Sequence, residues 1–376
     1  MRIGVPAESR AGETRVAATA ETVKKLVAAG HQVIVQTHAG VPSSLTDAAY
    51  MAVGASIGSA AEALGAELVL RVTSPSDAEL AHMSKGAVLV GMLNPFDKEG
   101  LAKLASAGLT AFALEAAPRT TRAQSMDVLS SQANIAGYKA VILASNIYQR
   151  FFPMLMTAAG TVKAARVVIL GVGVAGLQAI ATAKSLGAVI EASDVRPSVK
   201  EQVESLGGKF IDVPYETAEE KEAAEGVGGY ARPMPQSWLD RQKIEVAKRV
   251  AQADVVIATA LIPGRPAPTL ISEDMVKSMK PGSVIVDIAA GRGPGGVGGN
   301  CPLTETDKTV TKFGVHLVGE TNLPAMLGAD ASALYARNVQ DFLKLVIDKE
   351  AKFHVDMEDD IVAACLMCRD GTVLKA

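Results

Sequence analysis

The sequence predicts an α/β protein with two Rossmann-like domains, each built on a parallel sheet, joined by two long helices. Three observations lead to this class. Short apolar runs alternate with helical patterns over the first 115 residues, which is typical of a parallel sheet with crossover helices. The alternation starts again at Arg166. A long helical pattern lies at each border of this second unit, at residues 126–149 and 330–347.

Each element is predicted from the spacing of its apolar residues. In the first domain we expect strands at residues 2–5, 32–36, 68–72, 87–92 and 110–114, and helices at 21–29 and 98–106. In the second we expect strands at 166–170, 189–192, 209–213, 254–259, 283–287 and 315–318. Its helices are expected at 174–186, 197–206, 237–251 and 273–279.

The two long helices are interpreted as the crossings between the domains. This interpretation assigns residues 1–128 and 330–376 to a discontinuous first α/β domain, and residues 129–329 to a Rossmann domain. In the tail, Asp370-Gly371 predicts a hairpin between two strands within residues 353–374. Residues 212–236 and 290–301 are polar or rich in Gly. We expect both to be loops that bury little and stay mobile.

Composition and charge exclude several classes of protein. The formal net charge is -3, so the chain lacks the basic footprint of nucleic-acid binding. Three Cys are too few for a disulfide scaffold, and the N-terminus lacks the apolar segment of a signal peptide. The one candidate membrane span, residues 167–183, is short and contains three Gly. A buried strand, a turn and a helix explain it better, so we expect a soluble chain in a reducing compartment.

The strand at 166–170 runs into Gly171-Val-Gly173-Val-Ala-Gly176, a G-x-G-x-x-G motif between a strand and a helix. In this setting the first Gly allows a tight turn. The second lets the backbone approach a pyrophosphate, and the third lets the helix pack against the strand. The N-terminus of the following helix favours phosphate binding. The motif therefore predicts a dinucleotide site.

Asp194 lies at the end of the next strand, 18 residues after Gly176. A carboxylate at this distance takes the hydroxyls of the adenine ribose. Because it also repels a 2′-phosphate, NAD(H) is favoured over NADP(H). Arg196 favours NADP(H) instead, since an Arg near this position can accept the 2′-phosphate. We expect Asp194 to dominate.

A polar cluster at residues 119–131 precedes the first long helix and contains Arg119, Gln124 and Asp127. Ser125 or Asp127 as a helix N-cap explains one residue but not all three together. An ion pair between Arg119 and Asp127 would hold the loop in a fixed geometry. Hydride transfer between two rings needs placement rather than acid–base chemistry, so this loop is a candidate positioning element.

The remaining signals are weaker. Tyr230, in Gly228-Gly229-Tyr230, is either the tip of a lid over a nucleotide or an exposed aromatic on a loop. The five His have no metal-ligand spacing, and we expect no metal site. Cys365 and Cys368 have CxxC spacing but too few further ligands for zinc, and they are interpreted as strand residues.

Several long motifs together carry a resemblance. The chain resembles the soluble NAD(H)-binding component, domain I, of proton-translocating nicotinamide nucleotide transhydrogenases, in the version with a split alpha subunit. The matching blocks span nearly the whole chain and include RVAAT, PRTTRAQSMDVLSSQANIAGYKAV, VVILGVGVAGLQAIATAKSLGA, SDVRPSVKEQVESLGGKF, ATALIPGRPAP and GGNCPLTE.

The resemblance implies a Re/Si-specific transhydrogenase in which NADH bound here passes a hydride directly to NADP+ on a separate NADP(H)-binding component. A membrane-spanning component couples this transfer to proton translocation. It further implies a homodimer, and a cytoplasmic chain held on the inner face of the cell membrane by its partner subunits.

By motif, the resemblance assigns Arg119, Asp127 and Ser130 to the carboxamide side of the nicotinamide, and it directs Gln124 toward the second nucleotide. With Tyr230 these form the expected catalytic set. The other expected cofactor-binding residues are Gly171, Gly173, Val174, Ala175 and Gly176 at the pyrophosphate, Asp194, Val195 and Arg196 at the adenosine, Gly229 beside Tyr230, Gln242, and Leu261 near the adenine or ribose.

The same superfamily includes alanine dehydrogenase, so the alternative is a stand-alone amino-acid dehydrogenase of that type. Such an enzyme needs a Lys and a His to bind and activate a small keto acid. The segments that resemble those positions carry Thr73 and Asn94 here, and amino-acid oxidation then lacks its base and amine. A non-catalytic nucleotide sensor is disfavoured by the 119–130 cluster. The Gly-rich loop at 291–299 is longer than the transhydrogenase pattern.

Overall fold

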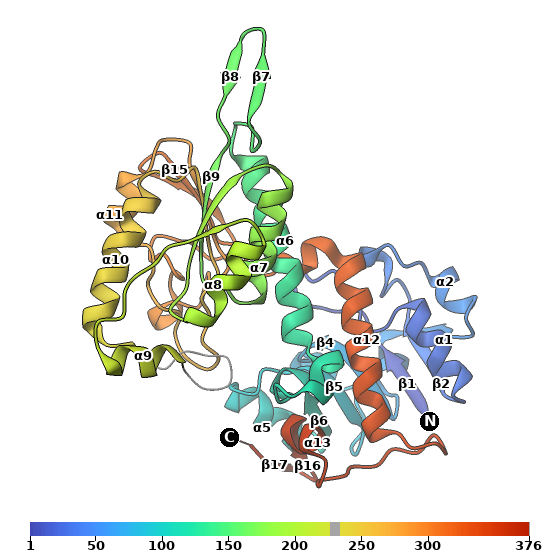
Figure 1. The fold of residues 1–376 in the computed structure, drawn as a ribbon. Helices are drawn as coiled ribbons and strands as arrows, with labels where there is room; N and C mark the ends of the chain where they lie inside the picture. The colour runs from blue at the N-terminus through green and yellow to red at the C-terminus, as the bar shows by residue number, and fades with distance from the viewer. Residues whose placement is uncertain (226–233, 376) are drawn as a thin grey trace. The chain divides into compact units, whose positions relative to one another are not determined.

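A computed structural model describes residues 1–225 and 234–375 of the chain. The chain divides into two compact units. Unit 1 comprises Met1–Gln132 and Pro324–Ala376, and unit 2 comprises Ala133–Leu323. The chain enters unit 2 inside α6 (Val128–Ile147) and returns to unit 1 just before α12 (Gly328–Val346), as can be followed in Figure 1. Unit 1 is thus built from two separate stretches of chain.

The described residues of unit 1 form a sheet in the order β17-β16-β6-β5-β4-β1-β2-β3. Strands β1 to β6 pair in parallel, and their order reverses between β1 and β4, which is the doubly wound Rossmann arrangement. β16 and β17 extend the sheet beyond β6 with antiparallel pairing. The bounds are β1 (Arg2–Val5), β2 (Gln32–Gln36), β3 (Ser56–Gly58), β4 (Leu68–Thr73), β5 (Val88–Met92), β6 (Thr110–Ala113), β16 (Leu366–Arg369) and β17 (Thr372–Val373).

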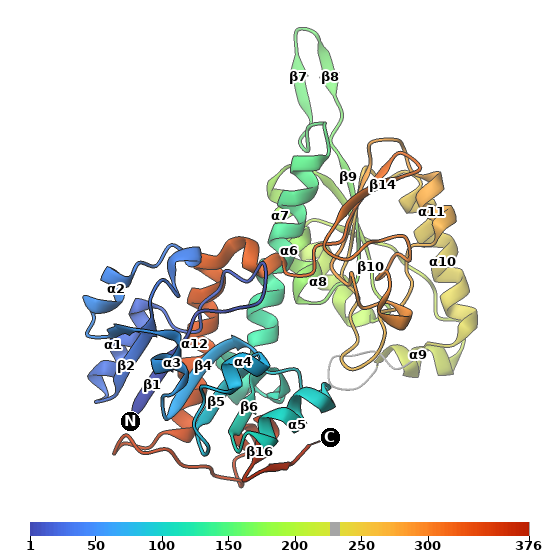
Figure 2. The same cartoon turned by 180° about the vertical axis from the view of Figure 1, so that it is seen from behind.

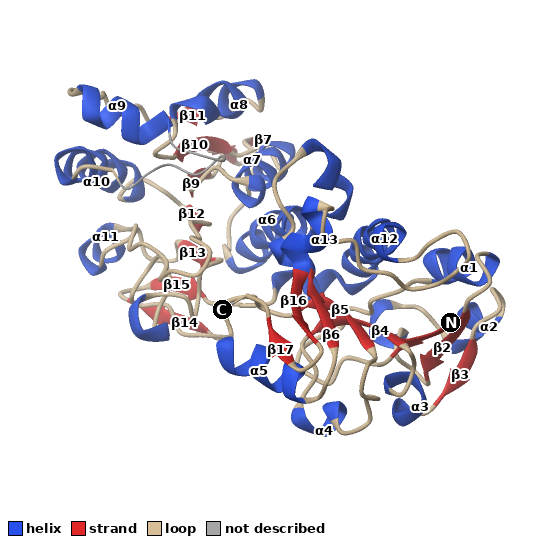
Figure 3. Cartoon of the chain, turned by 90° about the horizontal axis from the view of Figure 1, so that it is seen from below, coloured by secondary structure: helices blue, strands red, loops and turns tan. Residues whose placement is uncertain are grey.

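Helices cover both faces of this sheet, as Figure 3 shows. Successive residues of a strand face opposite sides, so Leu70 of β4 packs with α1, α12 and α13. Its neighbour Val69 packs with α3 and α5 on the other side. The helices of unit 1 are α1 (Ala20–Ala28), α2 (Asp47–Met51), α3 (Ala60–Leu64), α4 (Asp77–Leu80), α5 (Lys98–Ser106), α12 and α13 (Asp360–Cys365).

The main sheet in the described part of unit 2 has the order β11-β10-β9-β12-β13-β15-β14, again with the reversal beside the first strand, here between β9 and β12. β14 pairs antiparallel with β15, and the other pairs are parallel. The bounds are β9 (Arg166–Leu170), β10 (Val189–Ser193), β11 (Lys209–Phe210), β12 (Val255–Ala258), β13 (Val284–Asp287), β14 (Thr309–Lys312) and β15 (Val315–Val318).

This sheet is also covered on both faces (Figure 3). Ile169 of β9 packs with α6, α7 and α8, and Val168 packs with α10 and α11. Strands buried on both sides explain the unbroken apolar runs in the sequence. The other helices of unit 2 are α7 (Val174–Ser185), α8 (Lys200–Ser205), α9 (Ala218–Glu225), α10 (Gln236–Val250) and α11 (Glu273–Ser278).

A hairpin of β7 (Leu155–Thr157) and β8 (Gly160–Val162) stands clear of the main sheet of unit 2 in both views (Figures 1 and 2). Apolar side chains on and beside it are exposed: Met154 by 59% and Met156 by 76%. The sequence analysis did not anticipate this hairpin, because its three-residue strands are too short for a periodic signal.

The predicted α/β class with two Rossmann-like domains is confirmed, with differences in detail. Of the two long helices, only α6 crosses between the units, because α12 lies wholly in unit 1. β3 and β14 were not expected, since both lie at sheet edges and neither forms an apolar run. The Asp370-Gly371 hairpin is present, with positive φ at both residues. However, α13 precedes it, so the interpretation of Cys365 as a strand residue is wrong: Cys365 ends α13, while Cys368 lies in β16.

Two predicted loops bury more than expected. The segment 212–236 contains α9 and buries Ala224 and Met234. The segment 290–301 is exposed at Arg292 and at residues 294–297, but Ala290, Gly293 and Gly298 through Cys301 are buried. Its second half is held by hydrogen bonds to a buried carboxylate, which is described with the site below.

Candidate functional site

In the turn after β9, Gly occupies the positions where a side chain would strain the backbone, clash with it, or block a ligand from approaching it. Gly171 has a φ of 94°, a left-handed conformation that favours Gly. A Cβ at Gly176 would lie 2.0 Å from the carbonyl oxygen of Gly171. A Cβ at Gly173 would meet no atom within 4 Å, so the space over this residue is open to a ligand.

Helix α7 begins at this turn, with Val174 and Ala175 as its first residues. Gly173 is the N-cap and supplies no side-chain hydrogen bond to the helix. The first N–H groups of α7 therefore lack a side-chain cap and lie at the positive end of the helix dipole. This open, uncapped turn fits the pyrophosphate of a dinucleotide.

The turn lies where the strand order of unit 2 reverses, between β9 and β12. Ligands of open α/β sheets bind at such a switch point, beyond the carboxyl ends of the strands. The hydroxyl of Thr259, which follows β12, donates to the carbonyl oxygen of Gly171 at 2.9 Å. This bond ties the two loops that border the switch point to each other.

Asp194 directly follows β10, and its side chain is only 7% exposed. The carboxylate accepts from the backbone N–H of Val172 at 2.7 Å and from that of Arg196 at 2.9 Å. The guanidinium of Arg196 donates to both carboxylate oxygens at 2.9 Å. Asp194 and Arg196 thus form one bidentate pair beside the Gly turn, rather than two independent groups.

Further predicted residues of unit 2 lie near these loops. Gln242, on α10, donates to the hydroxyl of Ser193, the residue before Asp194, at 3.2 Å. Leu261 follows β12 and is 43% exposed. Val195 lies between Asp194 and Arg196 and packs in a small apolar cluster around Trp238. Gly229 and Tyr230 lie outside the described residues.

Two buried residues that the sequence analysis missed hold the loops at the carboxyl end of β13. Asp287 accepts from the backbone N–H groups of Ala289, Asn300 and Cys301 and from the hydroxyl of Thr304, at 2.9 to 3.1 Å. Burial raises the pKa of Asp287 above its usual value, although these hydrogen bonds lower it.

Asn300, fully buried, continues this network. Its amide group donates to the carbonyl oxygens of Ala260 and Pro268 at 2.9 and 2.8 Å, and its Oδ1 accepts from the N–H of Ala260 at 3.0 Å. The N–H and the carbonyl oxygen of Ala260, the residue before Leu261, are therefore both held by Asn300. The signal available in the sequence was the Asn that ends the Gly-rich run, directly after Gly299.

The predicted nicotinamide loop belongs to unit 1. Arg119 and Gln124 are exposed, and Asp127 and Ser130 are partly buried. Asp127 accepts from the N–H and the hydroxyl of Ser130, at 2.8 and 2.6 Å. Asp127 therefore caps α6 through Ser130. The structure brings Asp127 and Ser130 together, and Gln124 is exposed on the short helix Thr121–Met126.

This loop is anchored on both sides of Gln124 by distant residues that the sequence did not indicate. Asn338 of α12 donates to the carbonyl oxygen of Ser125 and accepts from the hydroxyl of Ser131, both at 2.7 Å. Arg122 forms ion pairs with Asp359, at 2.6 Å, and with Asp360 at the start of α13. Anchors that flank the exposed Gln124 make this loop a fixed platform. Their separation of more than 200 residues hides them from local sequence patterns.

Thr73 and Asn94, the two residues that distinguish this chain from the alanine dehydrogenase pattern, both make hydrogen bonds within unit 1. The hydroxyl of Thr73 donates to the buried Glu8 at 2.5 Å, and Arg71 pairs with Glu8 at 3.1 Å. Asn94 accepts from the N–H of Phe96 at 3.3 Å. None of these groups supplies a free base or amine at this edge of the unit 1 sheet.

Glu115 lies beside Asn94. Its carboxylate accepts from the N–H groups of Leu93 and Asn94, at 3.1 and 2.6 Å. Burial nevertheless raises the pKa of Glu115 to about 7, so this carboxyl changes charge near neutral pH.

The three Cys are buried and free, and burial raises the pKa of Cys365 to about 12 and that of Cys368 to about 11. The described residues contain no group of His, Cys, Asp or Glu that is arranged to hold a metal ion. Within the same residues, no helix combines the length and apolar character needed to cross a membrane.

Family models described as the N-terminal and C-terminal domains of alanine dehydrogenase/PNT match residues 4–136 and 140–376. The chain is 50% identical over 383 residues to the first part of the NAD(P) transhydrogenase alpha subunit of Rhodospirillum rubrum, covering 100% of this chain and 98% of that protein. Alanine dehydrogenase of Bacillus subtilis is 32% identical over 332 residues, which are 86% of this chain and 80% of that protein.

A solved structure of transhydrogenase from Sinorhizobium meliloti superposes with a TM-score of 0.89 at 45% identity, covering 100% of both chains. The two family models together account for nearly all of the sequence. The chain therefore belongs to the alanine dehydrogenase/PNT family.

Proposed function

We propose that this chain is the NAD(H)-binding subunit of a proton-translocating NAD(P) transhydrogenase. The observation that carries the proposal is the Gly-rich dinucleotide turn in a chain whose polar loop at 119–130 is held in place by distant hydrogen bonds and ion pairs. The one acidic residue in this stretch of the sequence, Asp127, is hydrogen-bonded to Ser130. Direct hydride transfer needs positioning and no proton transfer by the protein. The 50% identity to a transhydrogenase alpha subunit over the whole chain supports the same choice.

Unit 2 would hold the nucleotide. The turn at Gly171, Gly173 and Gly176, with Val174 and Ala175, would take the pyrophosphate on backbone N–H groups. Asp194, Val195 and Arg196 would hold the adenosine, and the Asp194 carboxylate favours the two hydroxyls of NAD(H) over a 2′-phosphate. Gln242, Leu261, Gly229 and Tyr230 are proposed to complete this site.

Unit 1 would supply the nicotinamide loop. When bound, NADH supplies a hydride to NADP+ on the NADP(H)-binding partner. Arg119, Asp127 and Ser130 would orient the carboxamide, and the exposed Gln124 would reach toward the second nucleotide. The hydrogen bonds between Asp127 and Ser130 support a pre-organised loop.

The alternative, a stand-alone alanine dehydrogenase, is supported less well. Thr73 donates to Glu8, and Asn94 accepts a local backbone hydrogen bond. Neither residue can bind and activate a keto acid as Lys and His do.

The proposal includes partner subunits and a homodimer. A membrane-spanning component would couple hydride transfer to proton translocation and hold this chain, as a peripheral cytoplasmic subunit, on the inner face of the cell membrane. The β7–β8 hairpin supports the homodimer, because an isolated two-stranded hairpin is marginal and its exposed Met side chains favour burial in an interface.

The test is hydride exchange from NADH to NADP+, followed by absorbance with a thio-NADP+ analogue. The purified chain alone is expected to bind NADH but to transfer no hydride, and an added NADP(H)-binding component is expected to start the reaction. Gln124→Asn is expected to leave NADH affinity nearly unchanged and to slow transfer by about 10- to 100-fold. Alanine-dependent reduction of NAD+ by the chain alone would contradict the proposal.

A further inference from the structure

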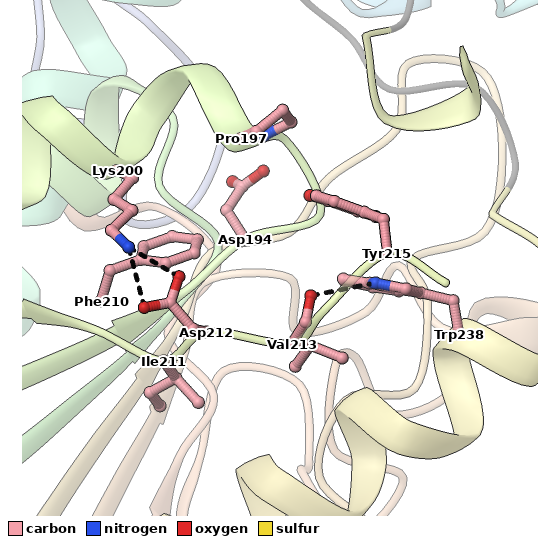
Figure 4. Close-up of a pocket in the computed structure, with 9 residues that line it drawn as sticks. All are labelled: Asp194, Pro197, Lys200, Phe210, Ile211, Asp212, Val213, Tyr215 and Trp238. Atoms are coloured by element: carbon pink, nitrogen blue, oxygen red, sulfur yellow. Dashed lines mark hydrogen bonds and ion pairs between the residues drawn. The ribbon is translucent and has the colours of Figure 1, made fainter. Parts of the chain in front are cut away.

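A small pocket lies at the carboxyl ends of β10 and β11 in unit 2, and Figure 4 shows its lining. One wall is Asp194, the proposed partner of the adenine ribose. The facing wall carries two aromatic residues, Tyr215 and Trp238, to which the proposed function gives no role. An exposed ion pair of Lys200 and Asp212, at 2.8 Å, closes the side of the pocket near β11.

Tyr215 connects the two walls. Its hydroxyl donates to the carbonyl oxygen of Val195, the residue that follows Asp194, at 3.0 Å. Burial, with the negative charges of Asp194 and Asp212, raises the pKa of Tyr215 above its usual value. The hydroxyl therefore stays protonated at neutral pH and remains a donor to this carbonyl.

Trp238 holds the ring of Tyr215 in place. The two rings stack with centroids 5.6 Å apart and an angle of 9° between their planes. Trp238 is itself 1% exposed, and its Nε1–H donates to the carbonyl oxygen of Val213 at 3.3 Å. A ring fixed by stacking on a buried indole has little freedom to turn its hydroxyl away from Val195.

Helix α10 therefore braces both neighbours of Asp194. Trp238, in the first turn of α10, acts through Tyr215 on Val195, and Gln242, one turn later, donates to the Ser193 hydroxyl. A carboxylate that must meet two ribose hydroxyls needs its backbone fixed on both sides, because hydrogen bonds weaken steeply when misaligned.

We propose that Tyr215 is a positioning residue of the adenosine site: its hydroxyl, held by the Trp238 ring, fixes the Val195 peptide and so the direction of Asp194. This inference rests on the proposed NADH site. It adds that the residues supporting that site include the stacked pair of Tyr215 and Trp238.

The test uses Tyr215→Phe, which removes one oxygen and keeps the ring that stacks on Trp238. Tyr50→Phe is the matched control, because Tyr50 is a buried Tyr of unit 1 that also donates to a backbone carbonyl, that of Ala18, at 2.7 Å. Dissociation constants for NADH and AMP are measured by calorimetry. Tyr215→Phe is expected to weaken both ligands by about five-fold, the equivalent of one hydrogen bond, and Tyr50→Phe to change neither.

Trp238 is the only Trp in the chain, so its emission reports on this pocket. AMP does not absorb at the emission wavelength of Trp. Because Asp194 is connected to Trp238 through Val195 and Tyr215, adding AMP to the wild type is expected to change the Trp238 emission. In Tyr215→Phe this response is expected to diminish.

Three outcomes separate the possibilities. Equal five-fold losses for AMP and NADH support the positioning role. A Tyr215→Phe variant that is less stable but binds AMP as tightly as the wild type overturns the role and leaves the proposed function standing. A wild-type chain that binds neither NADH nor AMP overturns both.

Discussion

Replacing Asn300 by Ala tests the claim that one buried amide holds the loops beside the nucleotide turn. The change removes three hydrogen bonds to Ala260 and Pro268, at 2.8 to 3.0 Å, from a side chain with no exposed surface. At about 1 kcal/mol for each bond, the expected loss of unfolding free energy is about 3 kcal/mol. The backbone groups of Ala260 would be left without their partners, so the turn that leads to Leu261 is expected to loosen.

Urea unfolding followed by the emission of Trp238 is the suitable assay, because this residue reports on unit 2 alone. Asn146→Ala is the control: Asn146 is exposed on α6, and its replacement is expected to change stability by no more than about 0.5 kcal/mol. Asn300→Asp keeps the acceptor but loses both donors and buries a charge, so it is expected to destabilise at least as much as Asn300→Ala. If Asn300→Ala unfolds at the same urea concentration as Asn146→Ala, the network does not support this loop.

Three further results are expected. Asp194→Asn removes the charge that repels a 2′-phosphate and releases Arg196 from its ion pair. NADH should then bind about ten-fold more weakly, and the ratio of NADPH to NADH affinity should rise in fluorescence titrations. An unchanged ratio would contradict the selectivity argument. Glu115 has a folded pKa of about 7, above the 4.5 of the unfolded chain, so the folded state binds its proton more tightly. The contribution of this group to the free energy of unfolding is complete below about pH 4.5 and is lost as pH rises through about 7, by about 3 kcal/mol in all. In a pH series of unfolding curves, Glu115→Gln should remove this dependence of the unfolding free energy on pH. If the dependence persists in the variant, Glu115 is not its source. Met156→Lys on the exposed hairpin should shift the proposed dimer toward monomer without lowering the stability of the monomer. Light scattering measures the mass in solution, and an unaltered mass would place the interface elsewhere.

Local patterns in the sequence predicted most of the fold. The strands β1, β2, β9 and β15 have the expected bounds, because their apolar runs stand out from polar flanks. The edge strands β3 and β14 were missed, because neither has a buried residue and neither forms an apolar run. The G-x-G-x-x-G turn lies in the expected setting because it is local in sequence.

The supporting residues of the candidate site could not be predicted in the same way. Asn338 reaches Ser125 across 213 residues, and Arg122 reaches Asp359 across 237. No periodicity connects such partners, and only the packing of α12 and α13 on unit 1 brings them together. Tyr215 and Trp238 are closer in sequence, but their stacking depends on where α10 begins.

The discontinuity of unit 1 has a consequence for the order in which the protein forms during synthesis. Unit 2 is one continuous stretch and leaves the ribosome complete while unit 1 still lacks α12, α13 and β16. Until those residues emerge, β6 is an open sheet edge, and Phe112 lacks the ring of Phe342 that packs 5.3 Å away. An uncovered strand edge recruits other chains. The last 53 residues therefore decide whether the first 132 end as a folded unit or as an aggregate.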